Sequence, residues 1–406
     1  MKTNDIRIEL PPSKSHSIRW LFANCLSPYN FHIKNLSKAE DVEVAQRVIG
    51  KLEAGKECEF DCGESGLVSR ILVSILALRE GEYVVKGDKR LCERPIAPLV
   101  DALVQLGGPQ VTYLGKKGCL PVRIVGAVPE KKLAVVKPAM SGQFVSALLY
   151  GAAQLEEGLI VRMKERPASK PYIEMTCRVL SEAGASNDYK ATHTTIRQQS
   201  MLPFGKVREV TIERDWSAAA YFYMAALFLP KRRIRLVGLS LNTLQGDVAA
   251  VELFKKLGVI TKEVRSPYKN GCSVTIEGGG EIAKQLTLNV NDTPDLMPTV
   301  AVACAAMGVD CYIKGIDNLK YKESDRAEAV MTELEKMGCK VEVDGDVMHL
   351  PPSAMHPQKT VRTYGDHRMA MAFGVLKIMF PDLVIEDKEV VNKSFPGFWD
   401  QLEKLL

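Results

Sequence analysis

Pro12-Ser13-Lys14-Ser15-His16-Ser17-Ile18-Arg19 begins with the small and hydroxyl residues typical of a helix N-cap and leads directly into an apolar run. A helix N-terminus presents unpaired backbone N–H groups and a partial positive charge, so it is a natural site for an anion. Five further stretches of the chain open in a similar way. The six openings begin at Ser13, Glu64, Ser141, Asp215, Asp292 and Asp366, and the last five lie roughly 75 residues apart. This repetition predicts a chain that binds a small, highly charged molecule.

A second set of repeated segments supports the same periodicity. Four amphipathic helices are predicted, and each ends on a Gly suited to the left-handed C′ position. These glycines are Gly107, Gly184, Gly258 and Gly338. Residues 218–229 and 299–307 are instead apolar nearly all round, so they are expected to be buried in the middle of a domain. An apolar helix, an amphipathic helix and several short strands, repeated about six times, predict an α/β fold.

The length of the chain predicts two domains. At 406 residues it is long enough for two units that each bury a core. A charged segment with Pro and Gly at residues 203–213 divides the repeats into two sets of three. The first strand, expected within residues 1–10, is assigned to the second set because the Pro11-Pro12 break follows it. The predicted domains are residues 13–212, and residues 1–12 together with 213–406.

The composition excludes several classes of function. The net charge of +5 is spread along the chain without basic stripes, so nucleic acid is not expected as a partner. No apolar run reaches membrane-spanning length and no secretory pattern opens the chain, which predicts a cytoplasmic protein without a membrane partner. The ten cysteines lack zinc-ligand spacing, so neither a metal nor disulfides are expected. A nucleotide-binding glycine loop and a nucleophile elbow are also absent from the sequence.

Two charged segments are candidates for chemistry. Ser15 and Arg19 share one helix face, and Lys14 projects from the first turn. In the segment Lys322–Arg326, the two terminal cations lie on one face, which suits an anion held between them. Glu323 adjoins the first of these cations, and a carboxylate beside an ammonium group is the pairing that an acid–base catalyst needs. Each segment taken alone is also typical of a solvated, capped helix start.

Ten segments, taken in their order along the chain, resemble the EPSP synthase (3-phosphoshikimate 1-carboxyvinyltransferase) family over nearly the whole length. They are Pro12-Ser-Lys-Ser15, Cys62-Gly-Glu-Ser-Gly66 with Arg70, Glu93-Arg-Pro-Ile96, Ser141-Gly-Gln-Phe144, Ser169-Lys-Pro-Tyr172, Gln245-Gly-Asp247, Pro294-Asp295, Lys322–Arg326, Asp366-His-Arg-Met-Ala370 and Lys393-Ser-Phe-Pro396. The resemblance implies an inside-out α/β barrel fold. Two similar domains, each of three βαβαββ repeats around buried central helices, are expected to close on the substrates between them.

The resemblance also implies a reaction of the shikimate pathway, which leads to chorismate and the aromatic amino acids. The enolpyruvyl group of phosphoenolpyruvate would move to the 5-hydroxyl of shikimate 3-phosphate with release of phosphate. The implied partners of a monomeric enzyme are these two substrates, and no cofactor is implied. The implied catalytic residues are Asp295, Glu323, Lys322 and Lys14. Those implied for shikimate 3-phosphate are Lys14, Ser15, Arg19, Ser141, Gln143, Ser169, Tyr172, Asp295, Asn318 and Lys322. Those implied for phosphoenolpyruvate are Lys14, Gly66, Arg94, Gln143, Arg326, Arg368 and Lys393.

Three positions depart from the family pattern. Glu64 stands where the family has Asn, Leu67 where it has Thr and Gly142 where it has Ser. Glu64 is expected to repel the phosphate of phosphoenolpyruvate, and Gly142 removes one hydroxyl from the acceptor site. Trp20 and Trp216 are bulkier than the usual residues, and packing is the expected explanation. Two alternatives therefore stay open: a related enolpyruvyl transferase with another acceptor, and a non-catalytic phosphometabolite-binding protein that kept the fold.

Overall fold

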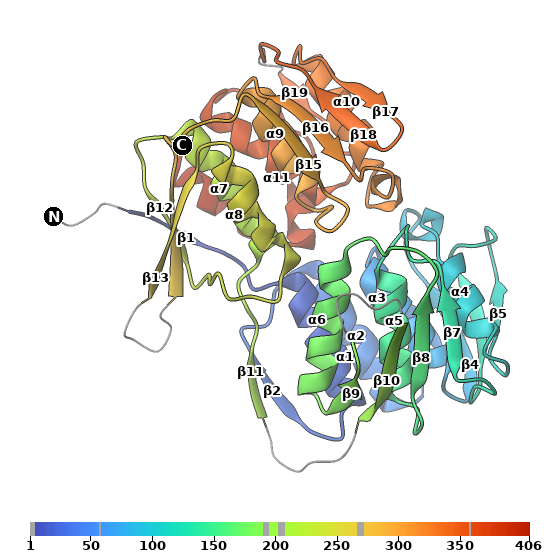
Figure 1. The fold of residues 1–406 in the computed structure, drawn as a ribbon. Coiled ribbons are helices and arrows are strands. Elements are labelled where there is room, and N and C mark those ends of the chain that lie inside the picture. The colour runs from blue at the N-terminus through green and yellow to red at the C-terminus, as the bar shows by residue number, and fades with distance from the viewer. Residues whose placement is uncertain (1–4, 57, 190–194, 202–207, 266–271, 357–358) are drawn as a thin grey trace. The chain divides into compact units, whose positions relative to one another are not determined.

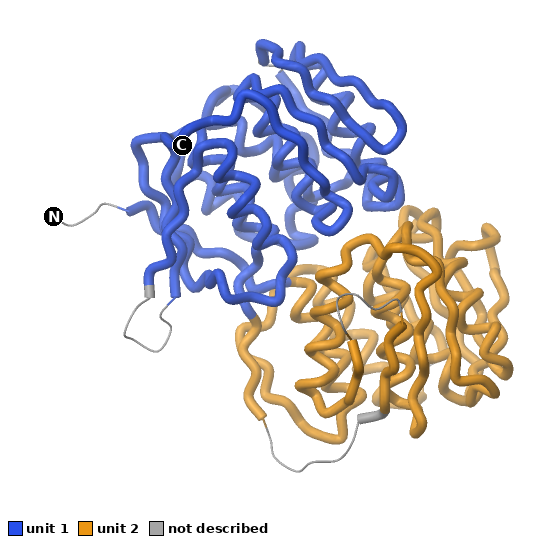
Figure 2. The backbone as a smooth tube through the Cα atoms, in the orientation of Figure 1, with its two compact units in different colours: residues 1–13, 213–406 blue, residues 14–212 orange. Residues whose placement is uncertain are grey.

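A computed structural model describes residues 5–56, 58–189, 195–201, 208–265, 272–356 and 359–406. The chain divides into two compact units, which are unit 1 (Met1–Ser13 and Glu213–Leu406) and unit 2 (Lys14–Ile212), as Figure 2 shows. The first boundary falls one residue after the one expected from the sequence, and the second falls between residues 212 and 213 as expected. The Ser13 amide donates to the Glu213 carbonyl at 2.8 Å. Residues 203–207 of the predicted boundary segment lie outside the described residues.

The sheets repeat one topology. Four of them have four strands each, in which a parallel pair is followed by two antiparallel strands, so each is a βαβαββ unit (Figure 1). The described residues of unit 2 form three sheets, whose strands are given in spatial order. The first consists of β3 (Glu59–Asp61), β4 (Gly81–Lys86), β6 (Val122–Gly126) and β5 (Gln110–Tyr113), and the second of β7 (Leu133–Val136), β8 (Leu159–Met163), β10 (Thr195–Met201) and β9 (Ala185–Asn187). The third is the parallel pair β2 (Phe31–Lys34) and β11 (Arg208–Thr211). In unit 1 the strands are β1 (Ile6–Glu9), β12 (Ile234–Val237), β14 (Cys272–Glu277) and β13 (Ile260–Arg265), then β15 (Gln285–Asn289), β16 (Asp310–Lys314), β18 (Val347–Leu350) and β17 (Glu342–Asp344), then the parallel pair β19 (Thr360–Val361) and β20 (Val384–Ile385).

These sheets confirm the predicted α/β class. Each unit has two complete βαβαββ sheets, and its third sheet has two strands among the described residues. The first strand was expected within residues 1–10, and β1 pairs in parallel with β12 inside unit 1. Residues 1–4 lie outside the described part of the chain.

Apolar and amphipathic helices alternate in each unit, as the sequence predicted. Unit 2 contains α1 (Lys14–Leu26), α2 (Glu40–Ala54), α3 (Gly66–Ala77), α4 (Ala97–Val104), α5 (Gln143–Ala153), α6 (Lys170–Glu182) and the 3₁₀ turn η1 (Leu91–Glu93). Unit 1 contains α7 (Trp216–Phe228), α8 (Ala250–Lys255), α9 (Met297–Ala306), α10 (Arg326–Lys336), α11 (His367–Gly374), α12 (Phe398–Glu403) and the 3₁₀ segments η2 (Gly246–Ala249), η3 (Leu319–Tyr321), η4 (Val375–Ile378) and η5 (Lys388–Lys393).

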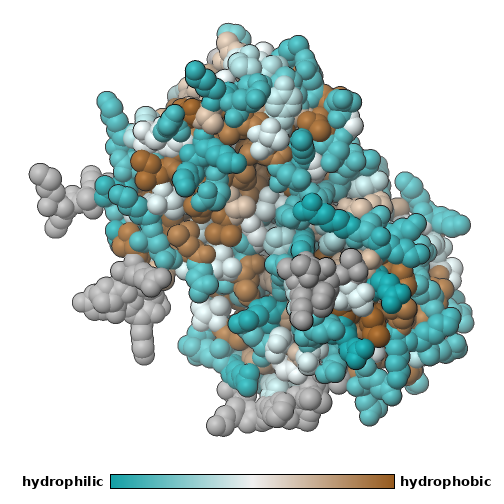
Figure 3. Space-filling model, in the orientation of Figure 1, coloured by the Kyte–Doolittle hydropathy of each residue, from teal (hydrophilic) through white to brown (hydrophobic). Residues whose placement is uncertain are grey.

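The helices α3, α5, α7, α9 and α11 form the cores. Every residue of α3 is buried, and so is every residue of α7 except Phe228. The helices α3 and α5 pack closely on each other. Their close approach is seen at Gly151, where a Cβ would overlap the Ser74 hydroxyl. Polar side chains instead dominate the surface of the face drawn in Figure 3. None of the described helices combines the length and the apolar character needed to span a membrane.

The helix ends test the predicted caps. Gly107, Gly184, Gly258 and Gly338 all have positive φ, as predicted; Gly184 and Gly338 occupy the C′ position, whereas Gly107 and Gly258 lie one residue beyond it. At the N-termini, the side chains of Asp215 and Asp366 do cap α7 and α11. The expected openings at Glu64 and Ser141 lie one residue before the N-caps Ser65 and Gly142, whereas the opening at Asp292 lies four residues before the N-cap Leu296. The largest error, at Asp292, arises because hydrogen-bonded turns between Val290 and Leu296 delay the helix.

Candidate active site

The centre of the candidate site in unit 1 is the guanidinium of Arg326, which begins α10 and is 0% exposed. Its Nη1 donates to Asp295 Oδ1 at 2.8 Å, and its Nη2 donates to Glu323 Oε2 at 2.8 Å. Its Nε donates to Asp366 Oδ2 at 3.0 Å. Three carboxylates therefore surround one buried cation and offset the cost of taking its charge out of water.

Asp295 joins this guanidinium to a second one. Its Oδ2 accepts a hydrogen bond from Arg368 Nη2 at 2.8 Å, while its Oδ1 faces Arg326. Arg368 Nη1 also donates to the Tyr221 hydroxyl at 3.3 Å. Burial alone raises the pKa of Asp295, but Arg368 and Arg326 outweigh burial and hold this pKa well below its usual range. Asp295 is therefore an ionised carboxylate that engages both guanidinium groups.

Two N-caps fix the positions of these side chains. The Asp325 carboxylate accepts from the Glu328 amide at 3.3 Å and starts α10. The Asp366 carboxylate accepts from the Arg368 amide at 2.8 Å and starts α11. Asp366 also accepts from the Ser324 hydroxyl at 3.0 Å. Because Asp366 bonds Arg326 as well, one carboxylate ties the start of α10 to the start of α11.

The remaining residues predicted in unit 1 lie on neighbouring segments. Lys322 directly follows η3, and its positive charge contributes to the lowered pKa of Asp295. Asn318 is buried and donates from Nδ2 to Asn291 Oδ1 at 3.2 Å. Lys393 is buried at the end of η5, which packs against α11. The direct contacts described above thus join Asp295, Glu323, Arg326 and Arg368, and they do not include Asn318 or Lys393.

The buried cation of unit 2 is Arg19 on α1, which is 2% exposed. Its Nε donates to Thr176 Oγ1 at 2.8 Å, its Nη1 to the Ser15 carbonyl at 3.0 Å and its Nη2 to the Tyr172 carbonyl at 3.1 Å. The guanidinium also lies 5.7 Å from the centroid of the Tyr172 ring, within cation–π range. All these partners are neutral, whereas those of Arg326 are carboxylates. Arg19 is thus held in place by neutral groups, and its positive charge is not neutralised by these partners.

A second group of predicted residues meets at the starts of α3 and α5. Arg70 Nη1 donates to Gln143 Oε1 at 2.8 Å and to the Gly66 carbonyl at 3.0 Å, and its Nη2 donates to the Pro95 carbonyl at 3.0 Å. A Cβ on Gly66 would lie 2.5 Å from Arg70 Nη1 and 2.8 Å from Arg94 Nη1. Only glycine therefore allows two guanidinium groups to close over this backbone. The structure brings Gly66, Arg94 and Gln143 together as the resemblance implied.

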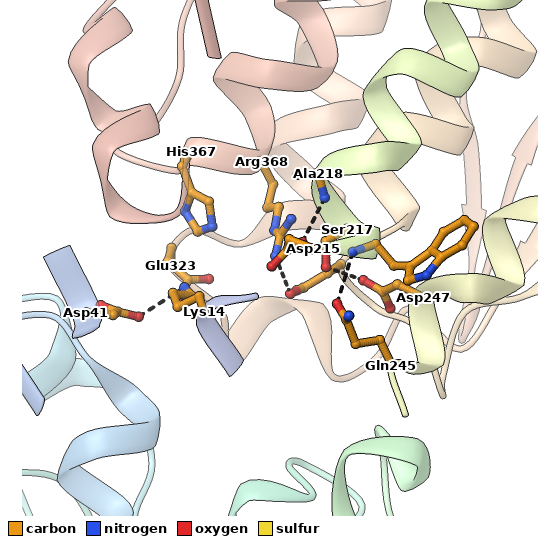
Figure 4. Close-up of polar contacts among 12 residues, drawn as sticks. Lys14, Asp41, Asp215, Ser217, Ala218, Gln245, Asp247, Glu323, His367 and Arg368 are labelled. Atoms are coloured by element: carbon orange, nitrogen blue, oxygen red, sulfur yellow. Dashed lines mark hydrogen bonds and ion pairs between the residues drawn. The ribbon is translucent and has the colours of Figure 1, made fainter. Parts of the chain in front are cut away.

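The other predicted residues of unit 2 occupy helix starts. Lys14 forms an ion pair with Asp41 at 3.0 Å, which is drawn in Figure 4. The Ser141 hydroxyl accepts from the Gln143 amide at 3.2 Å. Ser169 lies at the N-cap of α6 with φ of 56°, a left-handed conformation that costs a residue with a Cβ about 1 kcal/mol or more. Such strain persists only where the surrounding structure imposes it.

The three departures from the family pattern have different structural settings. Glu64 is exposed, one residue before the N-cap of α3, so its charge lies in water rather than in a buried site. Leu67 is buried in the first turn of that helix. Gly142 is the N-cap of α5, and a Cβ there would overlap the Ala168 carbonyl oxygen. A serine cannot occupy this position unless the backbone leading to Ser169 moves.

Packing accounts for both tryptophans, as expected. Trp20 is 1% exposed, lies 5.2 Å from the Phe31 ring centroid and donates from Nε1 to His16 Nε2 at 2.9 Å. Trp216 is fully buried and donates from Nε1 to the Ser240 carbonyl at 3.0 Å. Both indole N–H groups therefore have partners, as a buried tryptophan requires.

Replacing Gly142 with Ala is expected to lower the free energy of unfolding by about 1–3 kcal/mol, because the new methyl group meets a backbone oxygen that cannot rotate away. Urea unfolding measures this loss. Gly50→Ala is the matched control, since Gly50 lies within α2 and, apart from its chain neighbours and the backbone of its own helix, no atom of the described residues lies within 4 Å of its hypothetical Cβ. The control should gain up to about 1 kcal/mol from helix propensity. Equal stability of the two variants would contradict the overlap.

Several supporting residues were not predicted from the sequence as site residues. Asp41 pairs with Lys14, Asp366 holds Arg326, and Arg70 orients Gln143. Asp366 had a usable signal, because an acidic N-cap before an apolar helix was recognised. Asp41 had none, because an acidic residue in the first turn of an amphipathic helix is typical of any helix.

The arrangement suits acid–base chemistry on an anionic ligand. Glu323 is half-buried beside Lys322, and Asp295 is an ionised base candidate. Among the described residues, no cluster of three or more His, Cys, Asp or Glu side chains could hold a metal ion.

Comparisons with known proteins agree with this chemistry. A family model described as EPSP synthase (3-phosphoshikimate 1-carboxyvinyltransferase) matches residues 32–402. A 3-phosphoshikimate 1-carboxyvinyltransferase of Bacteroides fragilis (strain YCH46) is 34% identical over 403 residues, which cover 98% of this chain and 94% of that protein. The protein of the same name from Methanoculleus marisnigri (strain ATCC 35101 / DSM 1498 / JR1) is 32% identical over 418 residues, covering 98% and 96%.

Two solved structures share the fold. The EPSP synthase from Acinetobacter baumannii matches with a TM-score of 0.75 and 20% identity, over 99% of this chain and 96% of that one. The enolpyruvyl transferase NikO from Streptomyces tendae matches with a TM-score of 0.72 and 15% identity, over the same shares of 99% and 96%. At these identities the likeness concerns the fold alone.

Proposed function

The chain belongs to the EPSP synthase family, and from this premise we propose that it transfers the enolpyruvyl group of phosphoenolpyruvate to the 5-hydroxyl of shikimate 3-phosphate. The products are 5-enolpyruvylshikimate 3-phosphate and inorganic phosphate. The observation that carries the proposal is the network in which Arg326 and Arg368 hold Asp295, with Glu323 and Lys322 alongside. Simple binding of an anion needs the cations but does not need two carboxylates suited to proton transfer.

The acceptor is proposed to bind through its 3-phosphate to the first helix of unit 2. Arg19 is fixed by three neutral oxygens, and Lys14 and Ser15 precede it on the same helix start. A phosphate there would meet a guanidinium and the N–H groups of a helix N-terminus. The further acceptor ligands in this proposal are Ser141, Gln143, Ser169, Tyr172, Asn318 and Lys322.

Phosphoenolpyruvate carries a phosphate and a carboxylate, and planar arginine forks suit both groups. Arg368 and Arg326 are proposed to bind it from unit 1, together with Lys393. Arg94 and Gln143 are proposed to bind it from unit 2, where Gly66 permits a close approach to the backbone. Lys14 is proposed to contact both substrates.

The reaction proceeds by addition and elimination. The 5-hydroxyl oxygen bonds to C2 of phosphoenolpyruvate and gives up its proton to Asp295, while C3 gains a proton from Glu323. In the second step C3 returns its proton to Glu323, the C2–O bond to phosphate breaks, the departing phosphate takes up the proton held by Asp295, and the double bond re-forms. Lys322 stabilises Glu323 in its ionised form between the two proton transfers, because a neighbouring cation favours a carboxylate. Side chains held in place before the reaction also stabilise the charge that develops at C2.

Phosphate release from phosphoenolpyruvate, measured with purified protein in the presence and absence of shikimate 3-phosphate, tests this function. Release is expected only when both substrates are present. If both compounds bind without release of phosphate, the protein is a non-catalytic homologue and the proposal fails.

One observation favours the alternative of a related enolpyruvyl transferase with a different acceptor. Gly142 withholds the hydroxyl that the family places at the acceptor site, and the Ala168 carbonyl oxygen occupies the space beside it. Release of phosphate with a different hydroxyl-bearing acceptor, but not with shikimate 3-phosphate, would favour that alternative.

We also propose that the protein acts as a cytoplasmic monomer. Sedimentation of the purified chain tests the oligomeric state.

A further inference from the structure

A buried carboxyl group of unit 1 has no role in the mechanism described so far. Asp247 belongs to η2 and is 0% exposed. Its Oδ2 accepts a hydrogen bond from the Ser217 hydroxyl in the first turn of α7, as Figure 4 shows. The backbone beside it is held by Gln245, which accepts from the Trp216 amide at 3.0 Å. The position of the Asp247 carboxyl is therefore fixed by contacts between η2 and α7.

The second oxygen of this carboxyl is unsatisfied. Asp247 Oδ1 is buried and accepts no hydrogen bond from any described residue. An ionised oxygen in that setting would lose its hydration without compensation, which costs several kcal/mol. A protonated carboxyl avoids most of this cost, because the proton on Oδ1 removes the charge. The geometry thus favours the neutral acid over the carboxylate.

The charges around Asp247 act in both directions. Burial, together with the negative charges of Asp295 and Asp215, raises the pKa of Asp247 to about 7, although the Ser217 hydrogen bond and Arg368 oppose the shift. These groups come from the turn before α9, the N-cap of α7, the first turn of α7 and the start of α11. Arg368 is the cation among these groups, so its electrostatic interaction with Asp247 changes when this carboxyl ionises.

We propose that Asp247 is a positioning residue of this active site, a buried carboxylic acid whose neutral form leaves the charge of Arg368 available to the anionic substrate. The inference rests on the proposed function, in which Arg368 binds phosphoenolpyruvate. Arg368 already shares its charge with Asp295. If Asp247 ionised as well, a second carboxylate would attract the same guanidinium and repel the incoming substrate. The protonation state of Asp247 therefore affects the affinity of Arg368 for phosphoenolpyruvate.

Infrared difference spectroscopy of the unliganded protein tests the protonation itself. The spectrum of the wild type minus that of Asp247→Asn should contain the carbonyl band of a protonated carboxylic acid at pH 6. Because its surroundings raise the pKa of Asp247 to about 7, the band should disappear as the pH rises through that range. Absence of the band at pH 6 overturns the inference, whatever the enzyme catalyses. Because this readout needs no substrate, it does not depend on the proposed function.

Calorimetric binding of phosphoenolpyruvate tests the consequence. Wild-type affinity should fall about tenfold between pH 6 and pH 8.5, because one negative charge appears close to Arg368. Asp247→Asn, which imitates the neutral acid, should match the wild type at pH 6 and lack this fall. Ser217→Ala removes a hydrogen bond that lowers the pKa, so it should move the fall to higher pH.

These two variants also protect the test against a folding defect. If Asp247→Asn does not fold, the shift caused by Ser217→Ala still decides the question. An identical pH dependence in all three proteins contradicts the inference. If the infrared band is present but no variant binds phosphoenolpyruvate, the proposed function fails while the protonation of Asp247 stands.

Discussion

Replacing Asp295 with Asn is expected to lower kcat by about 1,000-fold and, at the same time, to tighten the binding of phosphoenolpyruvate alone. The first effect follows from its proposed role, since an amide cannot accept the proton of the 5-hydroxyl. The second follows from its contacts. Asp295 Oδ1 and Oδ2 each lie 2.8 Å from a guanidinium nitrogen, of Arg326 and Arg368 respectively.

Asp295 therefore occupies the groups that are proposed to receive the substrate carboxylate. A bidentate carboxylate on two arginines is the contact that phosphoenolpyruvate itself would make. In the wild type the substrate must displace this internal carboxylate, and part of its binding energy is used for that exchange. The released Asp295 is then free to act on the acceptor hydroxyl. An asparagine binds the arginines more weakly, so the exchange costs less.

Calorimetry gives the affinity for phosphoenolpyruvate, and single-turnover phosphate release gives the chemical step. Asp310→Asn is the control, because Asp310 also bonds neighbouring side chains, Gln285 and His349, but lies on β16 outside the network. It should leave both measurements unchanged. A variant of Asp295 that loses affinity and turnover in equal proportion would show that the residue only positions the substrate.

The sequence predicted the architecture because the repeat is expressed in local signals. Apolar helices, amphipathic helices and glycines such as Gly107 and Gly338 recur at fixed spacing, and each is determined by neighbouring residues. The helix beginning at Met297 was misplaced because turns between residues 290 and 296 depend on hydrogen bonds that no simple pattern encodes. The residue pattern of a repeat therefore predicts the type of each helix, even where it does not predict the residue at which the helix begins.

The site was only partly predictable for a related reason. The resemblance supplied Arg326 and Asp295, but the partners that hold them come from distant parts of the chain. Asp366 is 40 residues from Arg326, and Thr176 is 157 residues from Arg19. Such contacts depend on the folded arrangement of helices within one unit. The structural setting of Gly142 could not be predicted either. The sequence shows that the serine hydroxyl of the family is absent at this position, but it does not show that a Cβ there would overlap the Ala168 carbonyl oxygen.

Replacing Arg326 with Met is expected to destabilise the protein by about 3–5 kcal/mol at pH 7 and to abolish phosphate release. Methionine keeps much of the volume but leaves Asp295, Glu323 and Asp366 without the cation that they share. Urea unfolding measures the loss. Arg178→Met is the control, since Arg178 pairs with Glu182 on the exposed face of α6, and its loss should cost about 0.5 kcal/mol or less.

The pH dependence of this loss distinguishes broken ion pairs from poor packing. Arg368 and Arg326 hold the pKa of Asp295 below its unfolded value, against the effect of burial. Its ionised form therefore stabilises the wild type above the unfolded pKa of about 3.9, and this contribution is lost as the pH falls through the lower folded pKa. Without Arg326 the folded pKa of Asp295 rises, so the variant loses less on acidification. The difference in unfolding free energy between the two proteins should therefore stay nearly constant between pH 7 and about pH 4 and shrink as the pH falls further, whereas a packing defect would leave it constant throughout.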